Sequence, residues 1–250
     1  MRKLSIKMGM GSGFLSLVLS GARGLTDEAQ VKLLRFLGLN RAEELFFKAL
    51  RKLDESSLQE DKLEAFRGIQ RFRNYKTKSP KESQVYQYLT KWYYVAIREM
   101  ALQSDFQVDA AWISEQLLFK VSVKEARAAL VFLEANGFIK INSDKKVEVP
   151  ERQIDCFGGV YKLSLTEFYR QMFALAHESI GLVPSEERSV LGHTFSITED
   201  QFGQVRELLK DVQKKIEALG GTDQKGTRVY QIGLQAFPLT SKKQNIKKED

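Results

Sequence analysis

Cysteine, histidine and proline are all scarce in this sequence. It has one cysteine, two histidines and four prolines among 250 residues. The lone Cys156 excludes an intramolecular disulfide, which is typical of a reducing compartment. With His177 and His193 on different predicted elements, the sequence contains no ligand cluster for zinc. Cys156 stands among apolar neighbours, so we interpret it as a structural thiol, and we expect no catalytic residues, no metal and no other cofactor.

Long hydrophobic runs are also missing. The longest, residues 14–19, is interrupted by Ser16, whereas a membrane-spanning helix needs roughly 20 apolar residues. The N-terminus carries two basic residues without the apolar stretch and cleavage site of a signal peptide. We therefore expect a cytoplasmic protein that is not an enzyme and makes no contact with a membrane.

The positive charge is concentrated at one end of the chain. Net charge is +7, and the first 53 residues hold ten Lys and Arg against four Asp and Glu. Residues 82–150 hold eight against nine, and residues 151–250 hold fourteen against fourteen. A localised basic excess is what a polyanionic partner such as double-stranded DNA requires, although a solvated surface with chance bias explains it too.

Apolar residues at three-to-four spacing predict a mainly α fold with a smaller α+β part. The predicted helices cover residues 4–9, 12–20, 27–37, 41–53, 60–73, 82–102, 109–117, 122–136, 164–181 and 199–219. Alternating residues predict strands at 138–142, 146–149, 188–197 and 228–237. The predicted domains are 1–53, a basic helical connector at 54–81, 82–150, 151–240, and a disordered basic tail at 241–250.

The first predicted domain reads as an incomplete helix-turn-helix. Glycine turns separate its short helices, and the second of these would place its outward residues in the major groove. Small residues on that helix and flanking basic residues suit close approach to DNA and contacts with phosphates. The candidate DNA-binding residues here are Lys7, Ser12, Ser16 and Arg23.

The region 82–150 reads as a winged-helix-like unit. Ser122 and Glu125 form a capping box before a helix, and a hairpin turning at residues 143–144 follows it. The candidate DNA-binding residues here are Lys124, Arg127, Lys145 and Lys146. Such a unit also serves as a dimerisation module or scaffold. The tyrosine-rich helix 82–102 is either a core helix or a stacking surface for nucleotides.

Residues 151–240 predict an α+β unit for sensing a ligand or forming a dimer. The helix 199–219 would cover a sheet built from the strands at 188–197 and 228–237. The sequence does not indicate which ligand such a unit would bind. Because units of this kind also form dimers, we expect a homodimer.

Several segments of the sequence resemble one known family. They are residues 12–26 with the following helix to Leu39, residues 88–99, residues 112–133, residues 168–172, and residues 229–240. Together they look like the Fibrobacter/Bdellovibrio paralogous family of proposed transcriptional regulators, along nearly the whole chain. The resemblance implies a regulator with a repressor-type helix-turn-helix in front and a C-terminal domain of unknown function behind.

Members of that family begin with a further helix, which is missing here because Met1 stands three residues before the first predicted helix. Either the chain begins upstream, or a later helix completes the motif, or DNA binding has been lost. The sequence thus predicts a DNA-binding transcriptional regulator whose effector is unknown. The alternative is a regulator-derived scaffold that binds a protein partner and no longer reads DNA.

Overall fold

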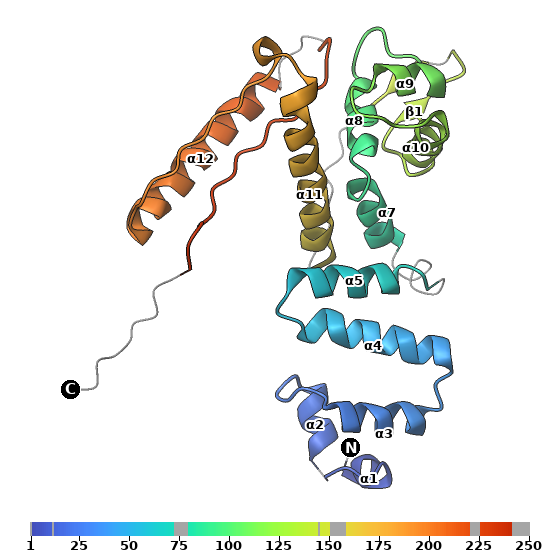
Figure 1. Cartoon of the computed structure of the whole chain (residues 1–250). Helices are drawn as coiled ribbons and strands as arrows, with labels where there is room; N and C mark the ends of the chain where they lie inside the picture. Colours follow the sequence, from blue (N-terminus) through green and yellow to red (C-terminus); the bar gives the residue numbers. More distant parts are fainter. Residues whose placement is uncertain are drawn as a thin grey trace, which may run out of the picture. The chain divides into compact units, whose positions relative to one another are not determined.

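The computed structural model describes residues 2–11, 13–72, 80–144, 146–150, 159–220 and 226–241. Within these ranges the fold is mainly α, with one two-stranded antiparallel sheet (Figure 1). This confirms the predicted fold class. None of the described helices is both long and apolar enough to cross a membrane. The predicted disordered tail lies outside the described residues beyond Ser241.

The chain forms two units, one made of residues 1–91 with 153–168 and the other of residues 92–152 with 169–250. The first unit holds six helices of its own within the described residues. They are α1 (Arg2–Lys7), α2 (Phe14–Leu19), α3 (Asp27–Leu37), α4 (Arg41–Glu55), α5 (Gln59–Ile69) and α7 (Pro80–Leu89). The predicted domain boundaries after residues 53, 81 and 150 stay predictions.

Local signals explain where these helices begin and end. The Thr26 hydroxyl accepts a hydrogen bond from the backbone N–H of Ala29, which satisfies a free donor at the start of α3. Gly38 ends α3 in the left-handed conformation, at φ 63°, where glycine has no Cβ penalty. Asn40 and Glu43 then form a reciprocal capping box that starts α4.

The core of the first unit lies where α4 and α5 meet other helices. Its fully buried members are Phe66, Ile69 and Leu163, and four more hydrophobic residues pack around them. Phe66 meets Tyr86 edge to face with ring centroids 4.8 Å apart. Beside this core, Arg67 forms an ion pair with Glu167 at 2.9 Å. Burial raises the pKa of the Tyr86 hydroxyl, which fits its place at the edge of this core.

The second unit begins with a helical cluster followed by a hairpin. Its elements are α8 (Trp92–Met100), α9 (Ala110–Gln116), α10 (Val123–Ala135), β1 (Lys140–Ile141) and β2 (Val147–Glu148). Lys140 faces Glu148 and Ile141 faces Val147 in the antiparallel register. The order of three helices and a hairpin is the one that the sequence predicts for a winged-helix-like unit.

Aromatic and aliphatic side chains fill the core of this cluster. The least exposed are Tyr94, Ile97, Ile113, Leu133, Phe138 and Ile139. The predicted helix at 82–102 is in fact two helices, α7 and α8, because the chain breaks its helix at residues 90–91. Tyr88, Tyr93 and Tyr94 are all buried, so the stacking-surface interpretation of this tyrosine-rich stretch is wrong and the core interpretation is confirmed.

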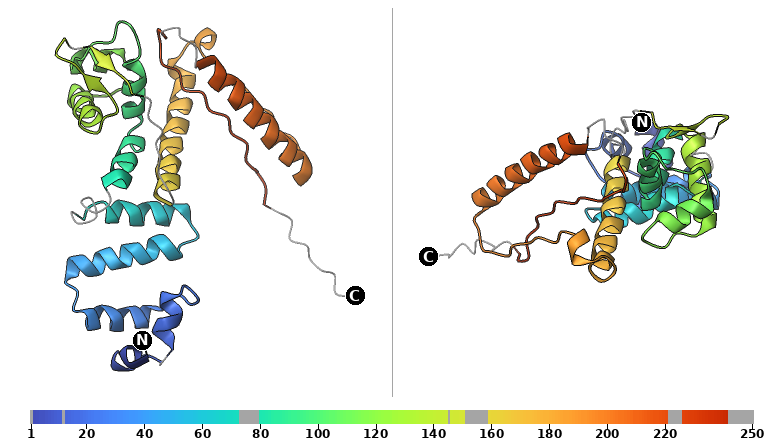
Figure 2. Two further views of the ribbon diagram at one scale, coloured as in Figure 1. Left: turned by 180° about the vertical axis from the view of Figure 1, so that it is seen from behind. Right: turned by 90° about the horizontal axis from the view of Figure 1, so that it is seen from above.

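Two long helices and two extended segments complete the described chain. The helices are α11 (Gly159–Leu182) and α12 (Glu199–Gly220), with a short 3-10 helix, η1 (Ser185–Glu187), between them. Residues 188–197 and 226–241 are extended but form no strand (Figures 1 and 2). The prediction of strands at 188–197 and 228–237 is therefore wrong for the single chain. The physical reason is that alternation favours an extended backbone, while a strand also needs a hydrogen-bonding neighbour.

Candidate functional site

The exposed face of α10 is the best-defined candidate surface. Lys124 and Arg127 are three residues apart, which places them on one side of the helix, and both are exposed. The opposite side is buried in the unit's core. Its members are Ala126, Ala129, Leu130 and Leu133. Because this buried side fixes the rotation of α10, the two cations are held facing outward.

The start of α10 is well ordered by its capping box. The Ser122 hydroxyl accepts from the backbone N–H of Glu125 at 3.3 Å, and the Glu125 carboxylate accepts from the N–H of Ser122 at 2.9 Å. The carboxylate next to Lys124 is thus occupied by the cap. Within the described residues no ion pair engages Lys124 or Arg127. Both cations therefore keep their charge available for a partner.

The hairpin that follows α10 in the sequence carries further basic residues. Lys146 is exposed, and its backbone N–H donates to the side-chain oxygen of Asn142 at 2.8 Å, which tightens the turn. Lys145 lies outside the described residues. Lys120 and Lys140 are also exposed, and sequence reasoning missed both. The signal that could have found Lys120 is its place two residues before the cap Ser122, at the helix end that enters the groove in DNA-binding modules.

The N-terminal candidates belong to α1, α2 and the turn after α2. Lys7 is exposed at the end of α1, and Ser16 is exposed on α2. The Arg23 guanidinium lies over the Phe14 ring, 5.1 Å from its centroid, so the side chain is held against α2. Ser12 lies outside the described residues.

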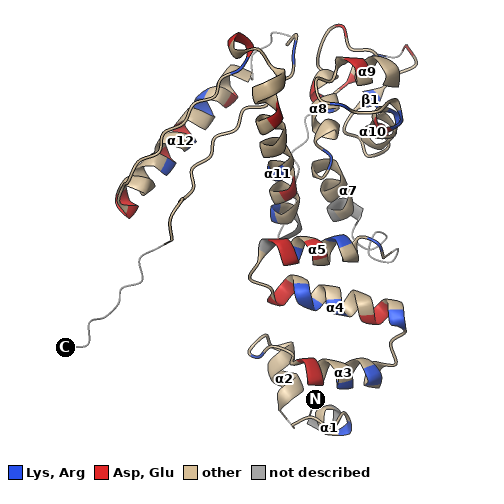
Figure 3. Cartoon of the chain, in the orientation of Figure 1, with Lys and Arg blue, Asp and Glu red and all other residues tan. Residues whose placement is uncertain are grey.

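Several basic side chains of the first 53 residues form ion pairs within the unit. Lys32 pairs with Glu28 at 2.7 Å, and this contact lowers the pKa of the Glu28 carboxyl. Arg51 donates to Asp27 at 2.6 Å, and Lys52 hydrogen bonds to a carboxylate of α5, which raises the pKa of its ammonium group. Figure 3 shows acidic and basic residues interspersed along α4. These three cations are thus engaged within the unit and are less available to a partner than the exposed Lys124 and Arg127.

The outward face of α2 is partly apolar. Leu17 is 45% exposed and Leu19 is 64% exposed, although both belong to the helix predicted to enter the major groove. Exposed leucines add no hydrogen-bonding groups for reading base edges. Of the two predicted DNA-binding modules, α10 therefore carries the more suitable surface.

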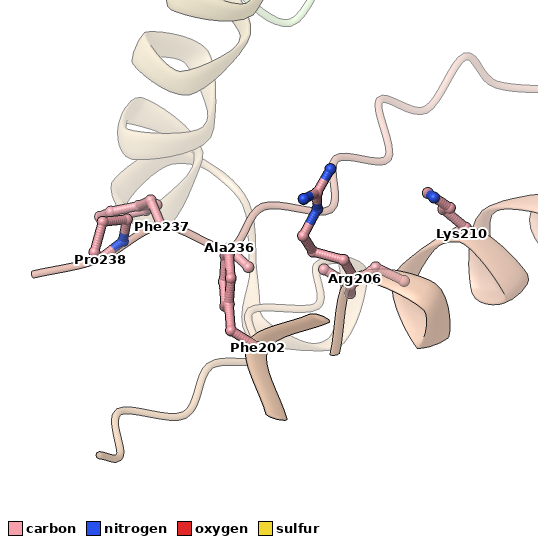
Figure 4. Close-up of a pocket in the computed structure, with 7 residues that line it drawn as sticks. Phe202, Arg206, Lys210, Ala236, Phe237 and Pro238 are labelled. Carbon is pink, nitrogen blue, oxygen red and sulfur yellow. The ribbon is translucent and has the colours of Figure 1, made fainter. Parts of the chain in front are cut away.

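Among the described residues, the structure brings together no group of three or more His, Cys, Asp or Glu side chains that could hold a metal ion. His177 on α11 and His193 in the extended segment are both exposed, and Cys156 lies outside the described residues. An open groove of about 440 Å³ lies between α12 and residues 236–238. Figure 4 shows Phe202 of α12 beside Ala236 there, and most of the groove's lining is apolar.

Comparison with known proteins identifies one family. No curated protein and no solved structure is significantly similar to the chain. A family model described as Domain of unknown function (DUF4423) matches residues 73–239, which is more than half of the chain. The match includes α7 to α12, and with them the winged-helix-like cluster and the extended segments. The chain therefore belongs to the DUF4423 family.

Proposed function

We propose that this protein is a DNA-binding transcriptional regulator without enzymatic activity, acting as a homodimer in the cytoplasm. The observation that carries the proposal is the exposed α10 face, where Lys124 and Arg127 project from the last helix before the hairpin without an ion pair among the described residues. In winged-helix-like units the corresponding helix enters the major groove, and basic side chains there contact phosphates or guanine edges.

Three further features support the proposal. The following hairpin carries Lys146, in the position of a wing that contacts the DNA backbone. Lys7 and Arg23 provide a second basic site in the N-terminal helices, whose sequence resembles a repressor-type helix-turn-helix in the Fibrobacter/Bdellovibrio paralogous family. The exposed leucines of α2 favour α10 over the N-terminal helices as the module that reads DNA.

Fluorescence anisotropy with a labelled random duplex at low salt tests the proposal. We expect binding that weakens steeply with salt, because phosphate contacts release counterions. Lys124→Glu and Arg127→Glu should each weaken binding roughly tenfold and lower the salt slope by about 1. Lys214→Glu changes the charge by the same amount on a different helix, α12, and should leave the affinity nearly unchanged.

The same titration separates the two modules. If Lys7→Glu and Arg23→Glu weaken binding while the α10 variants do not, the N-terminal helices are the reader and our assignment of α10 is wrong. If the wild-type protein binds no duplex at low salt, the DNA-binding function itself is wrong.

One observation favours the alternative, a regulator-derived scaffold that binds a protein. Leu17 and Leu19 are exposed on α2, and the nearby Ile6 on α1 is also exposed. Apolar side chains gathered on short helices are typical of a surface that another protein covers. A stoichiometric protein partner recovered with the wild-type chain and lost in Leu19→Glu, together with no DNA binding, would establish this alternative.

A further inference from the structure

The C-terminal part of the chain leaves an unusual amount of apolar surface uncovered. Thirteen large hydrophobic side chains between residues 190 and 239 are more than a third exposed. They come from α12 and from the two extended segments that flank it in sequence, 188–197 and 226–241. Monomeric proteins rarely leave large apolar surfaces exposed, so this concentration of exposed side chains favours a partner that covers the region.

Both extended segments alternate as strands do. Tyr230, Ile232 and Leu234 fall on one side of an extended chain, while Gln231 and Gln235 occupy the middle of the other side, between Val229 and Phe237. In residues 188–197 the positions 191, 195 and 197 are apolar in the same way, with small or polar residues between them. These patterns predict strands with one buried and one solvated face.

The backbones of these two segments lack the hydrogen bonds of a sheet. No backbone hydrogen bond joins residues 188–197 or 226–241 to another backbone group of the described chain. The contacts in this region use side chains, as where Arg228 pairs with Glu187. Two strands alone would make only a marginally stable sheet even if they paired with each other. A second pair of strands would provide the missing neighbours.

The two extended segments also lack the charged side chains that usually protect a solvent-exposed edge strand from pairing. Residues 229–241 contain no charged side chain, and residues 189–198 contain none apart from the titratable His193. Natural edge strands are protected from pairing by lysines, inward-pointing charges or prolines. The only such residue in these two stretches is Pro238, near the end of the second. The segments thus have the composition of strands that pair on both sides.

We propose that residues 188–197 and 228–237 of two copies of this chain pair into one intermolecular sheet, covered by the apolar stripes of both α12 helices. The stripe consists of the α12 residues Phe202, Val205, Leu208, Leu209, Val212, Ile216 and Leu219. This inference rests on the proposed homodimer and specifies its interface. The α+β unit that the sequence predicts is then formed between two chains. It contains four strands and two helices, enough for a sheet that is stable in water.

The available area and charge point to a second copy as the partner. At roughly 80 Å² for each of the thirteen side chains, one chain offers on the order of 1,000 Å² of apolar surface. A standard interface buries about 800 Å² per partner. In a two-fold dimer the same surface meets itself, so a strongly charged surface would repel. Here the described residues 188–241 hold six basic and five acidic side chains, which is nearly neutral.

Mass measurement on the full-length protein tests the proposal. Light scattering after gel filtration should give twice the chain mass of 28.6 kDa for the wild-type protein. Ile232→Lys places a charge on the apolar side of the second strand and should raise the dissociation constant at least tenfold. Gln231→Lys adds the same charge on the opposite side and should remain dimeric. A monomeric wild-type protein at about 100 µM, or equal behaviour of the two variants, would overturn the proposal.

Hydrogen exchange gives a second measurement that needs no variant. The backbone amides of residues 230–236 should be protected from exchange at high protein concentration. Their exchange rates should rise at least tenfold when the protein is diluted to the monomer. Protection that does not depend on concentration would mean pairing within one chain and would overturn the proposal. A complex with a different protein in place of the homodimer would overturn it as well. None of these measurements contains DNA, so a dimer that ignores DNA would contradict the proposed function alone.

Discussion

The winged-helix-like cluster at residues 92–150 and the C-terminal segments at 188–241 both contain periodic apolar residues. The cluster buries them, whereas the C-terminal segments leave them exposed. Leu133 in the cluster is completely buried, whereas Leu191 in the first extended segment is 92% exposed. Both belong to segments whose apolar residues recur with a regular period. The comparison teaches that a periodic pattern specifies which side of an element is to be buried, while it leaves open which chain buries it.

The largest expected effect comes from deleting side-chain volume in the two regions. Leu133→Ala should lower the free energy of unfolding by about 2–5 kcal/mol, because it removes buried methyl groups and leaves a cavity. Leu191→Ala should change the unfolding free energy of the same cluster by less than about 0.5 kcal/mol. Urea unfolding followed by tryptophan fluorescence measures this cluster alone, since Trp92 and Trp112 are the only tryptophans.

Protein concentration is the control for that pair of variants. The unfolding midpoint of Leu133→Ala should shift at every concentration, because its loss lies within one chain. Leu191→Ala should weaken only the association of two chains. At high dilution, where the protein is monomeric, the tryptophan-monitored unfolding of this variant should therefore match that of the wild-type protein. A large loss of cluster stability in diluted Leu191→Ala would show that the C-terminal segment packs on the cluster, and the comparison would fail.

A medium effect is expected from the two equivalent capping boxes. Ser122→Ala removes the acceptor for the N–H of Glu125 and should cost about 1 kcal/mol in the tryptophan-monitored transition. Thr198 caps α12 in the same way, with Gln201 as its reciprocal partner. Thr198→Ala should nevertheless leave that transition unchanged, because no residue of α12 is buried. An equal loss in both variants would mean that the two regions unfold as one.

The sequence predicted the helices well because their signals are local. Caps such as Ser122 and stops such as Gly137 act within four residues, so α10 and its buried side follow from the sequence alone. The exposed positions of Lys124 and Arg127 follow from the same period. Pairing partners for residues 188–197 and 228–237 are not local, and the alternation could not show that one chain leaves them unpaired.

Long-range ion pairs could not be predicted from the sequence either. Sequence reasoning counted Arg51 and Lys52 toward a basic surface, but in the fold they pair with acidic residues on α3 and α5. The pair between Arg51 and Asp27 joins positions 24 residues apart, and no spacing rule identifies it in advance. The charge balance of a region therefore does not show which of its cations are exposed and unpaired.

The smallest effect should come from a glycine on the solvent side of α12. A Cβ added at Gly203 meets nothing within 4 Å, and the residue has ordinary helical geometry, so Gly203→Ala should stabilise the helix by about 0.5–1 kcal/mol. Slower hydrogen exchange of the α12 amides would measure the gain. Gly137→Ala is the matched opposite, because Gly137 ends α10 at φ 68° and alanine is strained there. It should destabilise the cluster by roughly 1 kcal/mol. If Gly203→Ala instead abolished dimerisation, the interface would include the side of α12 opposite its apolar stripe, and α12 would be enclosed on both sides in the dimer.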